Sequence, residues 1–259
     1  MPSAEHYQRA LAAFAAGDRG AELVHGRLDG DGPLIVLDSS FNPPTAAHAE
    51  LARLACARET APRLLLLLAV RNADKGDVPA PLAERLAMME LLAAELADAG
   101  TAAAVAVGLT RHARFVDKAA GVAELAAGEQ VYLVGYDTAV RLLDAKYYDR
   151  PVAAALAGFM AQARLAVVVR DGADWPPAAE QRALAADVAA GRTAAPPAWA
   201  ARLAVIEPGA ATGAVSSSAA RRALATAAAA DAAATAAATA GLLHPAVALY
   251  AAQRGLYRS

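Results

Sequence analysis

Short apolar segments alternate with helical segments along most of this chain, and this alternation constrains the fold more than any other feature. Six apolar segments of four to eight residues are predicted to be buried strands: Pro33–Asp38, Arg63–Val70, Ala102–Gly108, Val131–Val134, Leu165–Arg170 and Leu203–Glu207. The predicted helices are Ser3–Ala16, Thr45–Arg58, Pro81–Ala99, Phe115–Ala127, Ser216–Ala230 and Pro245–Gly255. This alternation is typical of an α/β protein with a mostly parallel sheet of five or six strands and helices on both faces.

The composition first suggests a membrane protein, because 57% of the 259 residues are hydrophobic and the mean hydropathy is +0.30. However, alanine makes up about 30% of the chain, and alanine is a strong helix former that contributes little to a core. No window holds 18 consecutive large apolar residues, so we expect no transmembrane helix and no membrane partner. The tract Ala225–Ala240 carries no large side chain and is interpreted as a solvated helix or linker.

The charge and cysteine content exclude further classes of protein. With 24 basic and 26 acidic residues, the chain lacks the basic surface typical of nucleic-acid binding. A single cysteine, Cys56, excludes an intrachain disulfide framework and a cysteine-based zinc cluster, as expected in a reducing compartment. Residues Met1–Gly20 show no signal or transit peptide pattern, so we expect a cytoplasmic protein and leave a nuclear location open. The oligomeric state is left open as well.

The most informative motif follows the first predicted strand, where residues 38–48 read DSSFNPPTAAH. In a parallel sheet, ligands bind at the carboxyl ends of the strands. Thr45 and His48 are three residues apart at a helix start, so they share a face beside free backbone N–H groups. Such a site suits a phosphate, and the imidazole can donate to a phosphate oxygen as charge develops. The alternative is that His48 caps the helix or lies on the surface.

Other polar groups follow later strands or open a later helix. Ser217 and Ser218 begin a predicted helix, so their hydroxyls and N–H groups can cradle an anion. Arg221 lies one turn further and can reach the same anion; alternatively, it belongs to a solvated face. Lys75 follows the second strand and can supply a point charge, and Asp137 follows the fourth and can accept from ribose hydroxyls. The alternatives are a surface lysine and a helix cap.

Taken in chain order, these motifs resemble those of a known superfamily. Residues 38–48 resemble the GSFNPxTxxH form of the (H/T)xGH signature of nucleotidylyltransferases, most closely nicotinamide-nucleotide adenylyltransferases, which include a divergent fungal-type branch with SSFNPP. The resemblance continues through Asn72–Lys75, Val134–Asp137, the ISSTxxR-like Val215–Arg221 and a closing PxxVxxYI…LY-like pattern over Pro245–Tyr257. Ser39 and Ala47 stand where the family has glycine, and Ser218 stands where it has threonine.

The resemblance implies a single Rossmann-like nucleotidylyltransferase domain over residues 32–259, preceded by an N-terminal helical extension over residues 1–31. It implies catalytic roles for His48, Arg221 and Lys75. The nucleotide-binding residues that it implies are Ser39, Ser40, Phe41, Thr45, His48, Gly135, Asp137, Ser217, Ser218 and Arg221. Because no metal-ligand cluster is visible in the sequence, we expect Mg²⁺ to be held by ATP phosphates and water.

The function implied is transfer of AMP from ATP to nicotinamide mononucleotide, which gives NAD and pyrophosphate. Two alternatives stay open: a transferase of the same fold with another phosphate acceptor or with CTP, and a non-catalytic nucleotide-binding protein. Further candidates near the ligand are Arg170, the pair Tyr147 and Tyr148, and Trp175 and Trp199, whose rings could stack on a nicotinamide ring or pack in the core. Arg111 and His112 could contact a phosphate or lie in a solvated loop.

Overall fold

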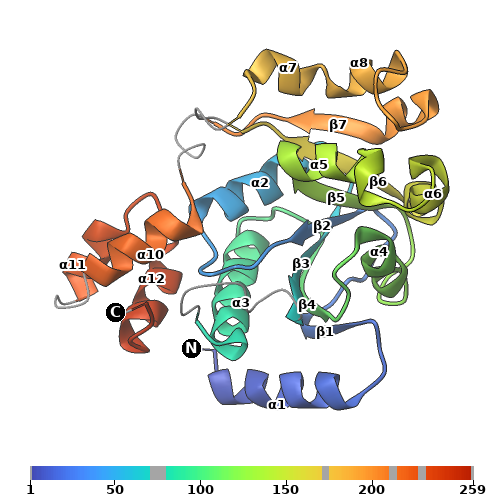
Figure 1. The fold of residues 1–259 in the computed structure, drawn as a ribbon. Helices are drawn as coiled ribbons and strands as arrows, with labels where there is room; N and C mark the ends of the chain where they lie inside the picture. Colours follow the sequence, from blue (N-terminus) through green and yellow to red (C-terminus); the bar gives the residue numbers. More distant parts are fainter. Residues whose placement is uncertain (1, 71–79, 171–174, 210–214, 227–231, 258–259) are drawn as a thin grey trace.

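The computed structural model describes residues 2–70, 80–170, 175–209, 215–226 and 232–257, and a seven-stranded sheet forms the centre of this part of the chain (Figure 1). The spatial order is β1-β4-β3-β2-β5-β6-β7, and every neighbouring pair from β4 to β7 is parallel. The strands are β1 (Ala21–Gly26), β2 (Leu34–Asp38), β3 (Arg63–Ala69), β4 (Ala104–Thr110), β5 (Gln130–Gly135), β6 (Ala163–Val168) and β7 (Leu203–Ile206).

The six predicted strands are confirmed as β2 to β7, and the mostly parallel α/β fold is confirmed with them. The prediction of five or six strands was one too low, because β1 was missed. β1 pairs antiparallel with β4 at the edge of the sheet, with Ala21 opposite Thr110. Residues 1–31 therefore contain a strand as well as the predicted helix α1 (Ala4–Ala16). The division of the chain at residue 32 stays a prediction.

Helices cover both faces of the sheet (Figure 1). Alternate residues of the buried strands point to opposite faces, as the pleat requires: Ile35 belongs to the core on one face and Val36 to the core on the other. The helices beyond α1 are α2 (Ala46–Cys56), α3 (Leu82–Asp98), α4 (Phe115–Ala123), α5 (Tyr136–Leu142), α6 (Val152–Gln162), α7 (Ala178–Arg182), α8 (Leu184–Ala189), α10 (Ser217–Thr226), α11 (Ala232–Ala238) and α12 (Pro245–Gln253), with short 3-10 helices at Ala145–Tyr147 and Pro197–Arg202.

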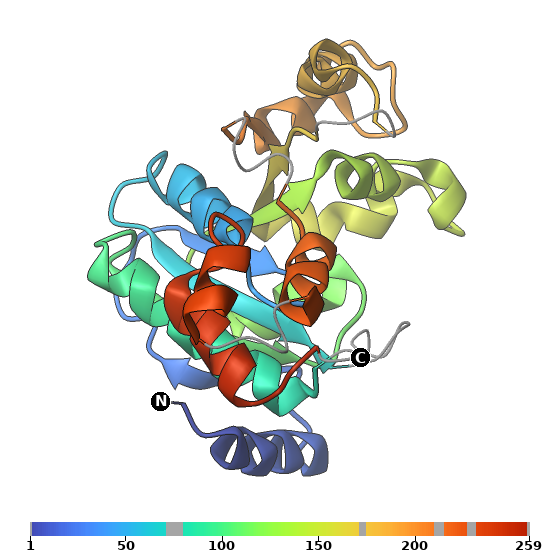
Figure 2. The same ribbon diagram turned by 90° about the vertical axis from the view of Figure 1, so that its left-hand side faces the viewer.

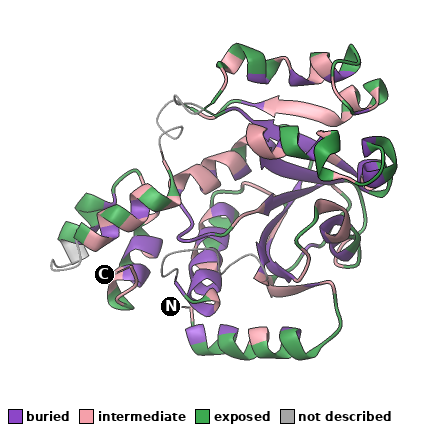
Figure 3. Cartoon of the chain, in the orientation of Figure 1, coloured by how far each residue is buried: buried purple, intermediate pink, exposed green. Residues whose placement is uncertain are grey.

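The distribution of these helices follows the two cores. Side chains of α1, α2, α3, α10 and α12 join the core on one face of the sheet, and those of α4, α5, α6 and α8 join the core on the other. Figure 3 shows the central strands coloured as buried, β7 mostly as intermediate, and much of α1 as exposed. None of the helices in the described ranges is long and apolar enough to cross a membrane.

The C-terminal helices α10, α11 and α12 lie together, at the front of the view in Figure 2. Polar bonds attach α12 to α3: Tyr250 Oη donates to Glu84 Oε2 at 2.6 Å, and Arg254 Nη2 donates to Glu84 Oε1 at 2.7 Å. Part of the alanine tract is not simply solvated, because Thr235 and Thr239 are buried. The tract therefore contributes a packed helix rather than a linker in its described part.

The topology marks one position at the edge of the sheet. From β2 the chain proceeds to β3 and β4 on one side, and then crosses to β5, β6 and β7 on the other. The strand order thus reverses between β2 and β5, which are neighbours. In open α/β sheets, ligands bind outside the carboxyl ends of the strands at such a switch point, so the residues after β2 and β5 define the candidate site.

Candidate functional site

His48 lies at this switch point, in the first turn of α2 and directly after the loop that follows β2. Its Nδ1 accepts a hydrogen bond from the backbone N of Thr45 at 3.0 Å, and the Thr45 hydroxyl lies 2.8 Å from the same atom. Because Nδ1 is an acceptor, the neutral ring carries its proton on Nε2. That N–H faces Ser39 Oγ at 3.0 Å. The imidazole is therefore held with a donor directed at the end of β2.

The surroundings favour the neutral form of this imidazole. Burial is the main cause, and the positive charge of Arg170 acts in the same direction; together they lower the pKa of His48 to about 4. The Phe41 ring is fully buried beneath it, with ring centroids 5.0 Å apart. Of the predicted ligand-binding residues, Phe41 and Thr45 are therefore buried supports of His48, whereas Ser40 is exposed.

The turn after Phe41 is tightly constrained. Phe41 has a φ of 44°, in the left-handed region that a bulky residue rarely adopts. Asn42 is 9% exposed, and its Oδ1 accepts from Ala80 N at 3.2 Å and from Tyr257 Oη at 2.9 Å. Strained backbone persists where its surroundings over-determine it, and here segments distant in sequence supply that constraint.

Arg221 and Ser217 bind the same turn from α10. Arg221 Nη1 donates to the backbone oxygen of Asn42 at 2.7 Å, and Nη2 donates to Ser218 Oγ at 3.0 Å. Ser217 Oγ donates to the backbone oxygen of Pro43 at 2.9 Å. The structure thus brings the serine–arginine motif and the histidine motif together, although about 170 residues separate them in sequence. These bonds use two of the five N–H donors of the guanidinium.

Gly135 and Asp137 lie beside this turn, at the end of β5. Gly135 has a φ of −65°, which any residue can adopt, so its backbone conformation does not require glycine. The reason for glycine here is the lack of room for a side chain. A Cβ at this position would lie 2.6 Å from Arg170 Nη2 and 2.7 Å from Asp137 Oδ1. Asp137 Oδ1 is buried without a hydrogen-bond partner among the described residues and faces Arg170 Nε at 3.8 Å. Oδ1 therefore keeps an unused hydrogen-bond acceptor position beside the Arg170 charge.

Arg170 is placed at the site by contacts that the sequence did not reveal. The side-chain amide of the buried Gln181 accepts from Arg170 N at 2.8 Å and donates to Arg170 O at 2.7 Å. It thus satisfies both backbone groups of Arg170, as the backbone of a neighbouring strand would. The guanidinium lies 5.9 Å from the centre of the Trp175 ring and half exposed. Gln181 was missed because a single glutamine in a polar segment carries no pattern.

A buried ion pair beneath the site was also missed. The Lys118 ammonium bonds to the carboxylate of Asp38, the residue before Ser39, and the two side chains are 5% and 11% exposed. Lys118 Nζ also lies 5.2 Å from the centre of the Phe115 ring. Buried ions are retained where they are paired; Lys118 follows the charged Asp117 in the sequence, so nothing local marked it as the buried one.

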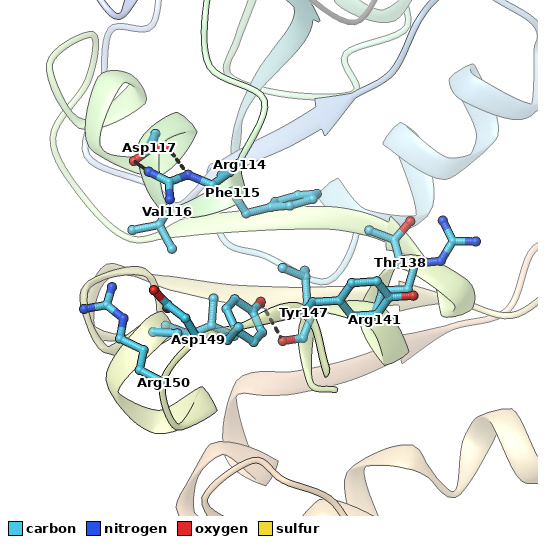
Figure 4. Close-up of a pocket in the computed structure, with 13 residues that line it drawn as sticks. Arg114, Phe115, Val116, Asp117, Thr138, Arg141, Tyr147, Asp149 and Arg150 are labelled. Atoms are coloured by element: carbon cyan, nitrogen blue, oxygen red, sulfur yellow. Dashed lines mark hydrogen bonds and ion pairs between the residues drawn. The ribbon is translucent and has the colours of Figure 1, made fainter. Parts of the chain in front are cut away.

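A cavity of about 680 Å³ opens beside these groups, between the start of α4, the helix α5 and residues 147–156 (Figure 4). Phe115 lies on one side and Tyr147, which is 53% exposed, on the other. Thr138, next to Asp137, forms part of the wall, and its hydroxyl is 3.5 Å from Asp137 Oδ2. Asp137 is not itself a lining residue, so the cavity is linked to its carboxylate through Thr138 and to the Asp38–Lys118 pair through Phe115.

The remaining candidates have different outcomes. Lys75 lies outside the described residues. Trp199 is partly buried and packs in the core on the α4 and α6 face. Arg111 donates to the backbone oxygens of Phe14 and Gly17 and so attaches the end of α1. Within the described ranges, no group of three or more His, Cys, Asp or Glu side chains is arranged to hold a metal ion.

Comparison with known proteins adds to this geometry. The chain matches no family profile. Over 149 residues it is 41% identical to the protein named "Putative nicotinamide mononucleotide adenylyltransferase" of Schizosaccharomyces pombe; the match covers 57% of each chain, so it spans less than two thirds of that relative.

Two solved structures of Plasmodium falciparum nicotinic acid mononucleotide adenylyltransferase have the same fold. The complex with APC has a TM-score of 0.57 at 12% identity, and the complex with NaAD has a TM-score of 0.55 at 13% identity. In both cases the match covers 87% of this chain and 97% of the other. The resemblance found in the motifs is thus confirmed: the chain is similar in sequence to the Schizosaccharomyces pombe protein, and it shares its α/β fold with the two Plasmodium falciparum structures.

Proposed function

We propose that this chain is an adenylyltransferase that transfers AMP from ATP to nicotinamide mononucleotide and releases NAD and pyrophosphate. The observation that carries the proposal is the joining of two motifs at the switch point: the neutral His48 and the anchored Arg221 converge on one turn after β2. Two donors directed at the end of a central strand suit a polyphosphate. The 41% identity to the Schizosaccharomyces pombe protein supports the choice of acceptor.

The reaction needs no protein base. An oxygen of the mononucleotide phosphate forms a bond to the α-phosphorus of ATP, and the bond from that phosphorus to the pyrophosphate oxygen breaks. The nucleophile is already ionised, and pyrophosphate leaves with the electron pair. Catalysis is then positioning plus stabilisation of charge on the phosphate oxygens.

Each proposed residue has a role that its contacts allow. His48 Nε2–H leaves Ser39 Oγ and donates to a phosphate oxygen; in the neutral form it does so without the cost of desolvating a charged ring. Arg221 adds a fixed positive charge, and the hydroxyls of Ser217 and Ser218 lie beside it at the start of α10. Asp137 accepts from a ribose hydroxyl. Lys75 would add a second charge.

Magnesium enters this proposal as part of the substrate, MgATP. The donors at the turn are an imidazole, a guanidinium and hydroxyls, which suit phosphate oxygens rather than a hard cation. The described residues thus fit a metal that is carried by the phosphates and water. Bound in this way, the ion would neutralise charge on the departing pyrophosphate.

The cavity beside Asp137 is the proposed site of the mononucleotide acceptor. Its walls carry aromatic rings, Phe115 and Tyr147, against which a pyridine ring can stack. Arg141 also lines it and is exposed, so an acceptor with a carboxylate in place of the amide would meet a positive charge. Both mononucleotides therefore belong in the test.

The test is an assay of the purified chain with MgATP and either nicotinamide or nicotinic acid mononucleotide, which measures dinucleotide and pyrophosphate. We expect stoichiometric NAD and pyrophosphate. His48→Ala should lower kcat by about 100- to 1,000-fold, with an unchanged circular dichroism spectrum. His6→Ala, at an exposed position on α1, is the matched control and should keep full activity.

The alternatives give different results in the same assay. Pyrophosphate release with another acceptor, or with CTP, would identify a different transferase of the same fold. Nucleotide binding without any pyrophosphate release would favour the non-catalytic alternative. Absence of NAD at saturating MgATP and nicotinamide mononucleotide would overturn the proposed function.

A further inference from the structure

Tyr257, in the segment after α12, reaches the turn on which the candidate site is built. Its hydroxyl donates to Asn42 Oδ1 at 2.9 Å, although 215 residues separate the two. Tyr257 itself has a φ of 62°, in the left-handed region. A tyrosine is strained there, so its conformation is selected by what the side chain contacts. The contact with Asn42 is the polar bond that the structure gives to this phenol.

Asn42 connects this phenol to the proposed phosphate-binding arginine. Its side-chain oxygen accepts from Tyr257 and from Ala80 N, and its backbone oxygen accepts from Arg221 Nη1 at 2.7 Å. The two bonds to Oδ1 tie the side chain of Asn42 to the segment after α12 and to residue 80, so loss of one of them removes a restraint on the turn whose backbone oxygen Arg221 contacts. The direction of the Arg221 guanidinium thus depends on how firmly Asn42 is held.

We propose that Tyr257 is a positioning residue for nucleotide binding: its hydroxyl fixes Asn42, and Asn42 in turn fixes Arg221. This inference rests on the proposed function, because it takes the anion at Arg221 to be a nucleotide phosphate. In this proposal the segment after α12 helps to hold the site in place, and Tyr257 does not need to contact the substrate.

A purely structural role can be separated from this one, because α12 has attachments of its own. Tyr250 and Arg254 both donate to Glu84 on α3. Those bonds keep α12 in place when the Tyr257 hydroxyl is removed. Tyr250→Phe is therefore a matched control: it removes a buried tyrosine hydroxyl from the same region without touching Asn42.

The experiment measures the Kd of MgATP by isothermal titration calorimetry without an acceptor, for the unaltered chain, Tyr257→Phe and Tyr250→Phe. A neutral hydrogen bond contributes about 1 kcal/mol, which corresponds to about a fivefold loss of affinity in Tyr257→Phe. Tyr250→Phe should bind within about twofold of the unaltered chain, although it loses a bond to a charged partner and should melt at a lower temperature. Equal losses in both variants, or no loss in Tyr257→Phe, would overturn the proposal.

The route through Arg221 is tested by a double-mutant cycle. In an Arg221→Lys background the bond to Asn42 is altered, so adding Tyr257→Phe should weaken MgATP binding by less than about twofold. A full, additive loss would show that Tyr257 acts by another route and would overturn the assignment. The NAD assay is independent of this cycle: MgATP binding without NAD formation would reject the acceptor and leave the result for Tyr257 intact.

Discussion

The electrostatics of His48 make a prediction about stability that does not depend on catalysis. In the folded chain the pKa of His48 is lowered from 6.5 to about 4, mainly by burial and further by the charge of Arg170. The unfolded chain therefore takes up a proton at this position below about pH 6.5, whereas the folded chain stays neutral until about pH 4. Because the unfolded state binds more protons in this window, stability rises with pH across it and is lost as the pH falls.

The size of the effect follows from the two values. The full difference corresponds to about 3 kcal/mol, at about 1.4 kcal/mol for each factor of ten in proton affinity. Between pH 7 and pH 5, the part that falls within the window is about 2 kcal/mol. His48→Gln removes the titrating group while keeping a side-chain N–H near the position of Nε2. This variant should therefore lack that part of the pH dependence.

The assay is urea denaturation of both proteins at pH 7 and pH 5, followed by circular dichroism. Every other titrating group is common to both proteins, so the difference between the two pH dependences isolates His48. The unaltered chain should lose about 2 kcal/mol more than His48→Gln on acidification, and His6→Gln, at an exposed position, should behave like the unaltered chain. Equal losses for the unaltered chain and His48→Gln would refute the assignment of a neutral imidazole with a lowered pKa.

Two further substitutions test the surroundings of the site. Gly135→Ala should weaken MgATP binding with little change in melting temperature, because the added Cβ meets the mobile ends of the Arg170 and Asp137 side chains rather than backbone; a large loss of stability without a change in affinity would contradict this. Lys118→Met should lower the free energy of unfolding by about 3–5 kcal/mol, because it leaves Asp38 almost buried and unpaired. In urea denaturation, Asp38→Asn combined with Lys118→Met should recover most of that loss, and an equally unstable double variant would show that the pairing is not the cause.

The sheet could be predicted from sequence because its central strands are buried on both faces. Residues 64–68 are five consecutive leucines, all at most 1% exposed, and such continuous runs are typical of parallel strands. β1 could not be found in the same way. Its sequence, Ala21–Gly26, is mostly half-exposed at the edge of the sheet, where antiparallel pairing with β4 supplies the stabilisation. A half-exposed edge position and pairing through backbone hydrogen bonds do not require a strong apolar pattern in the sequence.

The candidate site was predictable only in part, for a related reason. His48 and Arg221 lie in motifs whose residues are close in sequence, so spacing and resemblance could identify them. Asn42 and Tyr257 also lie in such motifs, but the bonds that join Asn42 to Tyr257 and to Arg221 span 215 and 179 residues, and Gln181 lies in no motif. Such contacts depend on how the helices dock, which local patterns do not specify. Sequence could therefore indicate groups suited to the substrate more readily than those that hold these groups in place.

The alanine content gives these long-range polar bonds particular weight. On α10, which carries Arg221, the buried side chains are Ala220 and Leu224. Burying an alanine contributes much less than burying a leucine, so packing alone orients this helix weakly. The bonds from Ser217 to Pro43 and from Arg221 to Asn42 have defined directions and restrict its rotation. A helix that packs through small residues can thus still present its arginine accurately, provided that the turn after Phe41 is itself held, and this requirement makes Asn42 and its partners part of the site.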